Sequence, residues 1–165
     1  QIIHYAITNN HPLLGICLAG RYKITIGQNG GVRAPTHADS LFGFLRNLKT
    51  INGNVNTSQT KTMSYMFYST GANVNSFIAD LSNWNVSNVT DMSNLFVFSG
   101  FNSLIWNVGN LNNWDVSNVV NMSGVFSSAG YSATTWNIGD LSNWNVSNVT
   151  NMTQTFCFSG FTSAS

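Results

Sequence analysis

The chain of 165 residues has very little charge, since only 7% of its residues are charged, where a soluble domain usually has about 25%. Glutamate is absent, and the chain has five aspartates, six basic residues, two prolines and two cysteines. Its hydrophobic content is an ordinary 43%, so neutral polar residues replace the charges: 25 Asn, 20 Ser and 15 Thr. No apolar run approaches the ~20 residues that span a bilayer, so we expect no transmembrane segment.

The scarcity of charge excludes several classes of function. A nucleic-acid-binding protein needs an excess of basic residues to neutralise phosphates, and the formal net charge here is +1. The low content of charged residues also argues against a charge-rich disordered tail. The few charges are unevenly distributed, with +5 over residues 1–61 and −4 over residues 62–165. The sequence therefore predicts a molecule with one basic and one acidic end.

A repeat of 30 residues dominates the C-terminal half of the chain. Units 80–109, 110–139 and 140–165 align without a gap, and residues 51–79 contain a degenerate copy. A fixed period of this size is typical of a solenoid, in which equivalent residues of successive coils stack. We therefore expect a structural ladder made of Trp84, Trp114, Trp144, Phe96, Phe126 and Phe156, and an amide ladder made of Asn88, Asn118 and Asn148.

Each unit predicts short extended stretches and one helical turn. Residues 84–86 alternate apolar and polar side chains, as a β-strand does. The apolar residues between 89 and 96 follow a helical spacing, and Gly100 is placed to end that turn. Residues 105–108 offer a second strand-like stretch. We therefore expect one short parallel β-strand and one helical or 3₁₀ turn in each coil.

Aspartate and asparagine replace one another from unit to unit. The three aligned sets are Asp80, Asn110 and Asp140, then Asn85, Asp115 and Asn145, then Asp91, Asn121 and Asn151. A position that accepts either residue needs a side-chain carbonyl oxygen, as an Asx turn does. Successive units never carry aspartate at the same position. If equivalent residues lie about 4.8 Å apart in parallel strands, this arrangement avoids repulsion between neighbouring carboxylates.

Residues 1–50 have a different pattern, and we expect them to form an N-terminal cap. Residues 22–26 alternate like a strand, Asn29-Gly30 is typical of a hairpin turn, and residues 32–34 are expected to begin the returning strand. Apolar residues between 41 and 48 follow a helical stripe. The predicted fold is thus a β-hairpin and short helix that cap a solenoid of residues 51–165.

The segments WNVSNVTDMSNLF (84–96) and WDVSNVVNMSGVF (114–126) resemble the repeats of bacterial surface proteins and lipoproteins of the BspA-like, DUF285 type. Residues 20–26 resemble the strand that precedes such arrays. The resemblance implies a leucine-rich-repeat-like solenoid on an exported, surface-exposed protein used in adhesion or recognition. This chain departs from the family pattern in its longer unit, with extra length after Phe96, and in its use of asparagine for aspartate.

The added length contains Trp106 and Trp136, which suggest one candidate binding site. Amphipathic tryptophans suit a ligand-facing ridge, and the alternative is burial beneath the added segment. Asp80 and Asp140 are a formal candidate for a pair of glycosidase carboxylates, but the exchange with asparagine favours a turn role. The histidines have no spacing typical of a metal site. We therefore expect no enzymatic activity, metal or cofactor.

Two functions remain open. The first is a recognition or adhesion module at the cell surface or outside the cell, with a protein or glycan on another surface as its ligand. The second is a structural subunit in which the basic end of one copy stacks on the acidic end of the next, which gives a filament or surface layer.

Overall fold

The computed structural model describes residues 2–5, 23–26, 32–51 and 55–163. In this part of the chain every strand pairing is parallel, and the one helix is the 3₁₀ helix η1 (Leu111–Asn113). The strands are β1 (Ile2–Tyr5), β2 (Lys23–Ile26), β3 (Val32–Arg33), β4 (Thr50–Ile51), β5 (Val55–Asn56), β6 (Ser76–Ala79), β7 (Ile105–Asn107) and β8 (Thr135–Asn137).

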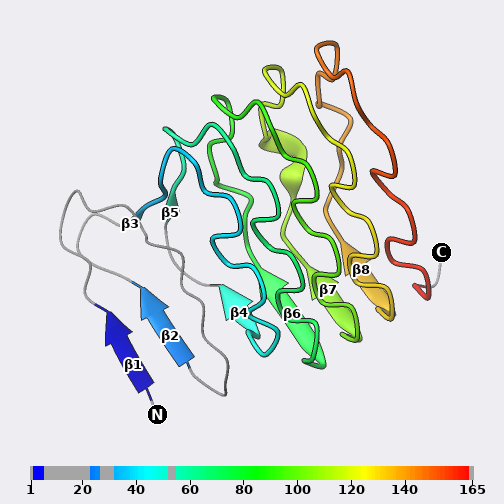
Figure 1. Cartoon of the computed structure of the whole chain (residues 1–165). Helices are drawn as coiled ribbons and strands as arrows, with labels where there is room; N and C mark the ends of the chain where they lie inside the picture. The colour runs from blue at the N-terminus through cyan, green and yellow to red at the C-terminus, as the bar shows by residue number, and fades with distance from the viewer. Residues whose placement is uncertain (1, 6–22, 27–31, 52–54, 164–165) are drawn as a thin grey trace.

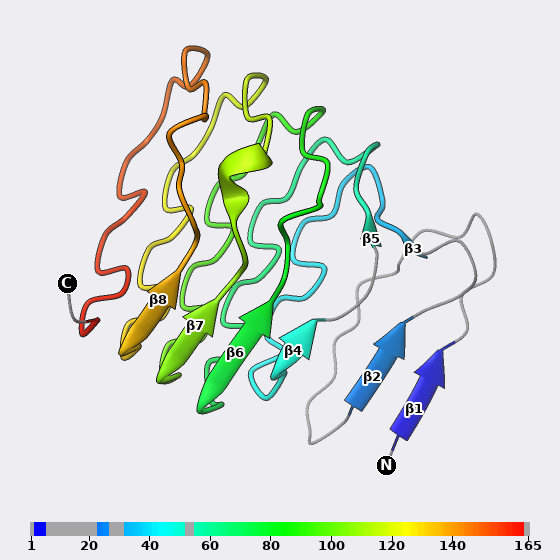
Figure 2. The same ribbon diagram turned by 180° about the vertical axis from the view of Figure 1, so that it is seen from behind.

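The chain winds into successive coils that stack side by side (Figure 1). Parallel bridges join His37, Thr62, Asp91, Asn121 and Asn151 in that order, so these residues mark the same point of successive coils. We number the coils from them: coil 1 is 37–61, coil 2 is 62–90, coil 3 is 91–120, coil 4 is 121–150 and coil 5 is 151–163. Coils 1 to 4 each contribute one strand to the sheet β4-β6-β7-β8 (Figure 2).

The sheet confirms one predicted strand and corrects another. Strand β7 coincides with the predicted stretch 105–108, and its Trp106 pairs with Phe77 of β6. Alternate side chains point inward, since Phe77 and Trp106 are buried whereas Ile78 and Ile105 are exposed. The strand predicted at 84–86 is wrong, because these residues join two turns, and the Trp84 N–H donates to its own coil, at Leu81.

The helical turn predicted at 89–96 is also wrong. In residues 92–98 every second N–H donates to the next coil, as at Asn94 to the Ser123 carbonyl, 2.7 Å. Between them, the Leu95 and Val97 N–H groups donate to the carbonyl three residues earlier, both at 3.2 Å, and the Ser93 N–H donates to the Asp91 side chain at 2.8 Å. Residues 94 and 98 have positive φ, which breaks a helix at each turn. The segment is therefore a run of β-turns that hydrogen-bonds within its coil and between coils.

The first coil lies inside the region predicted to be a cap. Strand β2 falls on the predicted strand 22–26, but β3 pairs in parallel with β5 and so is not the return of an antiparallel hairpin. The predicted turn at 29–30 lies outside the described residues. The helix predicted at 41–48 is wrong, because Phe42 and Phe44 donate their N–H groups to Met66 and Tyr68 of the next coil.

Stacked aromatic rings fill the space between the two long sides of each coil. One phenylalanine from each coil joins a continuous stack, with ring centroids 5.3, 5.1, 5.5 and 5.2 Å apart: Phe42, Phe67, Phe96, Phe126 and Phe156. Offset aromatic pairs contribute about 0.5–1.5 kcal/mol each beyond the area they bury. Trp114 and Trp144 stack at 6.4 Å, and Trp84 lies 5.7 Å from Phe67. This core fixes the distance between the sheet and the opposite side of the coils.

Candidate functional site

The two tryptophans predicted to form a ridge lie against the core. Trp106 is fully buried, and its indole N–H donates to the Ser99 hydroxyl at 3.1 Å. Trp136 is half-buried, stacks on Trp106 at 5.4 Å and donates to the Ala129 carbonyl at 3.0 Å. Trp106 therefore corresponds to the alternative interpretation, burial within the coil, and it presents no ring surface to a ligand.

The asparagines of the expected amide ladder connect coils through the backbone. Each side-chain amide donates to a carbonyl of the preceding coil: Asn88 to Ser58 at 2.7 Å, Asn118 to Ser87 at 2.8 Å and Asn148 to Ser117 at 2.7 Å. A direct contact between two amides occurs elsewhere, from Asn137 to Asn107, at 3.1 Å. The NH₂ group is therefore needed at positions 88, 118 and 148, whereas the Asx-turn positions need only an oxygen.

The predicted Asx turns are confirmed at all nine alternating positions. In each, the side-chain oxygen accepts the backbone N–H two residues later, at 2.8–3.1 Å, in residues 80, 85, 91, 110, 115, 121, 140, 145 and 151. The serine hydroxyl two residues on, followed by its backbone N–H, lowers the pKa of three carboxyls: Asp80, Asp115 and Asp140. These carboxylates stabilise turns and stay ionised, whereas a general acid needs a raised pKa.

A row of exposed and half-buried aromatic rings crosses the stack on the side opposite the sheet. We name it the aromatic stripe, and it consists of Phe44, Tyr65, Tyr68, Phe98, Phe101, Tyr131, Phe158 and Phe161. Neighbouring centroids lie 4.8–6.4 Å apart from Phe44 in coil 1 to Phe161 in coil 5. The stripe is thus one continuous apolar surface to which every coil contributes.

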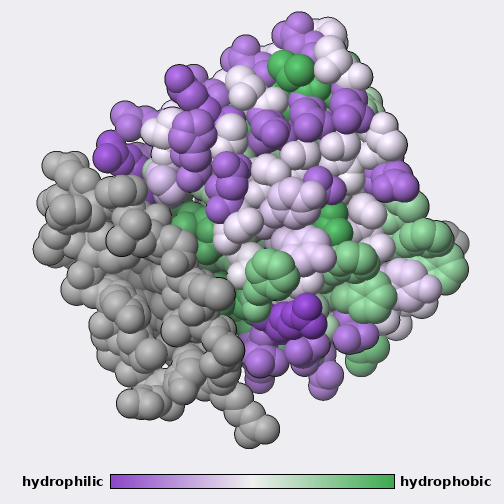
Figure 3. Space-filling model, in the orientation of Figure 1, coloured by the Kyte–Doolittle hydropathy of each residue, from purple (hydrophilic) through white to green (hydrophobic). Residues whose placement is uncertain are grey.

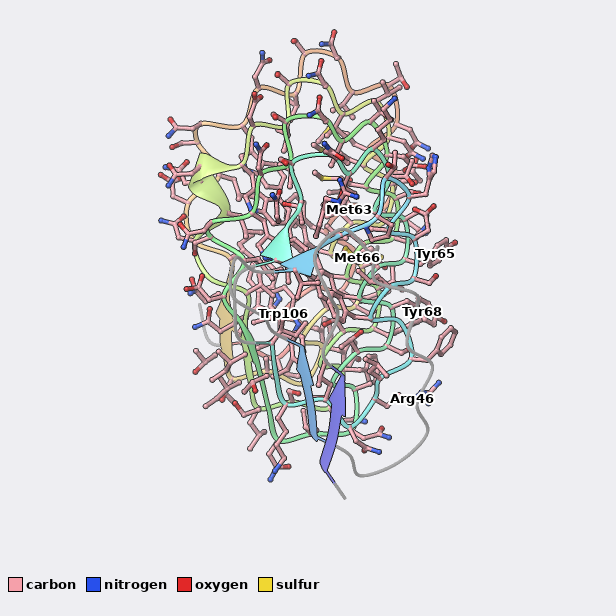
Figure 4. The ribbon with its side chains drawn as sticks, turned by 90° about the vertical axis from the view of Figure 1, so that its left-hand side faces the viewer. Arg46, Met63, Tyr65, Met66, Tyr68 and Trp106 are labelled. Carbon is pink, nitrogen blue, oxygen red and sulfur yellow. The ribbon has the colours of Figure 1, made fainter. Side chains whose placement is uncertain are left out.

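The views of the molecule place the stripe relative to the core. Tyr65 and Tyr68 project from one side of the stack, together with Arg46, while Trp106 and Met66 lie inside (Figure 4). The surface facing the viewer in Figure 3 has a band of hydrophobic residues across its lower half, with weakly polar residues above it and strongly hydrophilic ones below it. Large exposed apolar patches on soluble proteins mark interaction sites. The stripe is therefore the strongest candidate for a binding surface in the described part of the chain.

Three phenylalanines of the stripe have an unfavourable backbone conformation. The aligned residues Phe44, Ser69, Phe98, Ser128 and Phe158 all have left-handed φ, between 54° and 62°. The first four donate their N–H to the following coil. Left-handed φ costs roughly 1–2 kcal/mol for an L-residue, and a bulky side chain makes it a rare outlier. Phenylalanine and serine alternate at this position, so coils 1, 3 and 5 carry a ring where coils 2 and 4 carry a small polar side chain.

Burial offsets little of this strain. Phe44 is 56% exposed, Phe98 38% and Phe158 57%, whereas Ser69 and Ser128 are buried. Serine therefore satisfies the fold at this position, and the exposed rings lack a full explanation in packing. Strained residues of this kind cluster at functional sites.

The rings of the stripe have two orientations. Phe101, Tyr131 and Phe161 stack at 4.8 and 5.1 Å with interplanar angles of 13° and 11°, so they face one another along the stack. Phe98 and Phe158 are turned by 67° and 70° from the neighbouring Phe101 and Phe161. Their planes therefore run along the stack of coils rather than across it.

The stripe is not evident from the positions that are constant in every unit, because phenylalanine occupies its key position only in alternate coils. One signal in the sequence could have indicated it: phenylalanine recurs at twice the repeat period, as in Phe98, Ser128 and Phe158. A second signal was the spacing of three residues between Phe98 and Phe101 and between Phe158 and Phe161.

Fold and site together define a repeat protein of parallel-stranded coils with an exposed aromatic face. Within the described residues, no helix has the length and apolar character needed to cross a membrane. The chain belongs to the DUF285 family, described as Mycoplasma protein of unknown function, which matches residues 34–110 and 72–163. Neither a curated protein nor a solved structure matches it.

Proposed function

We propose that the chain is a non-enzymatic recognition module, a leucine-rich-repeat-like solenoid that works at a cell surface or outside the cell. The aromatic stripe is its binding surface. The observation that carries the proposal is the set of three exposed phenylalanines in left-handed conformation, Phe44, Phe98 and Phe158. Aromatic side chains dominate the energetics of binding surfaces because they desolvate a large area with few rotatable bonds.

The use of the acidic residues supports a non-enzymatic role. Asp80 and Asp140 each accept the N–H of the residue two positions later, at 3.1 and 2.8 Å, and asparagine replaces them in the intervening coil. A carboxylate that an amide can replace acts as a hydrogen-bond acceptor, while acid catalysis needs a proton. The test is hydrolysis of a panel of glycosides by the purified chain, and turnover that an Asp140→Asn variant lacks would contradict this part of the proposal.

The recognition role is tested by comparing surfaces and variants. The purified chain is applied to arrayed polysaccharides, glycoproteins and proteins beside a Phe44→Ser, Phe98→Ser, Phe158→Ser variant and a Val120→Thr control. Val120 is 44% exposed outside the stripe, and its aligned residues in the neighbouring coils are Thr90 and Thr150. We expect the triple variant to lose binding and the control to keep it. Equal binding by all three would refute the stripe as the recognition surface.

The proposed location is tested on the cells that make the protein. Protease treatment of intact cells is expected to remove the chain, while a cytoplasmic marker survives. Retention of the chain inside treated cells would contradict a surface or extracellular location.

The uneven distribution of charge favours a second candidate function, assembly. Residues 1–61 have a formal charge of +5 and residues 62–165 a formal charge of −4. The basic part of one copy is therefore electrostatically complementary to the acidic part of another, and a head-to-tail contact of this kind gives a filament or surface layer. Light scattering against concentration tests this role: growth of assemblies supports it, and a constant monomer mass opposes it.

A further inference from the structure

We propose that the aromatic stripe binds a neutral, unbranched, β-linked polysaccharide whose chain lies along the stack of coils. This inference rests on the recognition role proposed above and names the class of its ligand. Three features of the stripe carry it: the absence of charged residues from the segments that supply the rings of coils 2 to 5, the orientation of the phenylalanine rings, and the distance at which they recur.

The first feature is electrostatic. The sequence has no Asp, Glu, Lys or Arg in residues 62–79, 92–114, 116–139 and 141–163, which supply the rings of coils 2 to 5. In coil 1, Arg46 lies on the same side of the stack as Tyr65 and Tyr68 (Figure 4). A ligand that carries phosphate, sulfate or carboxylate groups needs a row of cations for its recognition. The surface therefore fits a ligand without charge.

The second feature is the orientation of the rings. Phe98 and Phe158 are turned 67° and 70° from the stacked rings beside them, so their planes follow the direction of the stack. In a β-linked sugar chain the hydroxyl groups point sideways, and the two faces of each ring expose C–H groups. Such a face packs on an aromatic plane and leaves the hydroxyls in contact with water.

The third feature is the repeat distance. Neighbouring parallel strands lie about 4.8 Å apart, so the phenylalanines of alternate coils recur at about 10 Å. One sugar of an extended β-1,4-linked chain advances by about the width of one coil, and successive sugars are turned over. The same face of the chain therefore returns at every second sugar, as Phe44, Phe98 and Phe158 return at every second coil.

Neutral hydrogen-bonding side chains flank the rings. Asn102, Ser132 and Thr162 each follow a ring of the stripe, and Asn102 and Thr162 are exposed. Amide and hydroxyl groups donate to and accept from sugar hydroxyls. A proline-rich peptide in polyproline II conformation has a similar repeat of about 9.3 Å, but its carbonyls need donors that phenylalanine rings lack. The stripe therefore favours the sugar chain over the peptide.

The experiment measures binding of the full chain to insoluble cellulose and chitin, and to cello-oligosaccharides by calorimetry. The variants are Phe98→Ser with Phe158→Ser, and Val120→Thr as the control. Serine occupies the aligned position in coils 2 and 4, so the double variant is expected to remain folded. We expect the double variant to bind at least about tenfold more weakly, the loss expected for removed aromatic stacking. We expect the control to bind like the original chain.

Glycan binding is also measured at high salt and in competition with a polyproline peptide. Binding to a neutral glycan is expected to persist at about 1 M salt, where charge attraction is screened. Failure of the folded chain to bind any neutral β-glycan would overturn the inference, as would preference for a polyproline peptide. If the chain binds a protein instead of a glycan, and the phenylalanine variants lose that binding, the recognition role stands and the glycan assignment fails. If the variants bind glycan as well as the original chain, both the inference and the proposed binding surface fail.

Discussion

Replacing Gly130 by alanine tests whether the tryptophans pack as described. Gly130 has φ of +55°, and an added Cβ would lie 2.7 Å from Cδ1 of Trp136 and 2.8 Å from Cβ of Trp106. Gly124 has a similar φ of +63°, but there the Cβ would meet the half-exposed side chain of Asn94, at 2.5 Å from its Oδ1. The two substitutions therefore share the backbone strain and differ in what surrounds the new methyl group.

The expected losses of unfolding free energy follow from these contacts. Left-handed φ costs an alanine roughly 1–2 kcal/mol, and overpacking of a rigid core adds about 1–3 kcal/mol. Gly130→Ala is expected to lose about 2–5 kcal/mol of unfolding free energy, and Gly124→Ala about 1–2 kcal/mol, because the Asn94 amide can rotate away. In both variants, alanine also makes the unfolded chain stiffer, which adds about 0.4–1 kcal/mol to the unfolding free energy. This contribution is the same in both and cancels when the two variants are compared.

Urea unfolding followed by tryptophan fluorescence measures the difference. For a chain of this length, each kcal/mol corresponds to about 2–4 °C in Tm, so thermal unfolding gives a second estimate. A smaller loss in Gly130→Ala than in Gly124→Ala would refute the described packing of Trp106 and Trp136.

Three further predictions concern the amides, the aromatic stack and the carboxylates. Asn118→Asp is expected to lose about 1–3 kcal/mol of unfolding free energy, because the NH₂ group of Asn118 donates to the backbone of coil 2. Asn151→Asp is expected to change the unfolding free energy little, because Asn151 supplies only an oxygen. Equal losses in urea unfolding would refute that distinction. Phe126→Ala is expected to lose about 3–5 kcal/mol and Phe156→Ala less than half of that, because Phe126 is fully buried and Phe156 is 49% exposed; calorimetry that ranks them in reverse would contradict the stack. The lowered pKa of Asp115 stabilises the folded chain above its ordinary pKa, so Tm is expected to fall slightly as pH drops below about 4. An Asp115→Asn variant that shows the same acid dependence would refute the assignment.

The repeat and its hydrogen-bond acceptors could be predicted from the sequence, because both depend on residues that recur at a fixed distance. The exchange of Asp80 for Asn110 indicated an oxygen acceptor, and the structure has one at both positions. Strand β7 was predictable from a short strand-like stretch, residues 105–108, that ends at Gly109.

The turn segment could not be predicted in the same way. An apolar spacing of three or four residues fits a helix, and it fits equally a run of β-turns whose alternate N–H groups bond to the next coil. The run of β-turns differs from a helix in the left-handed backbone at Asn94 and Phe98. The conformational preferences of asparagine and phenylalanine do not predict this backbone at both positions. The stripe was missed for a related reason, since its phenylalanines occupy every second coil.

The most direct test of the central claim is an NMR titration of the aromatic ring signals with cellohexaose. We expect shifts and line broadening at Phe44, Phe98 and Phe158, with little change at the buried Phe96 and Phe126. Ring signals that stay unchanged throughout the titration, or shifts confined to the sheet side of the coils, would contradict it.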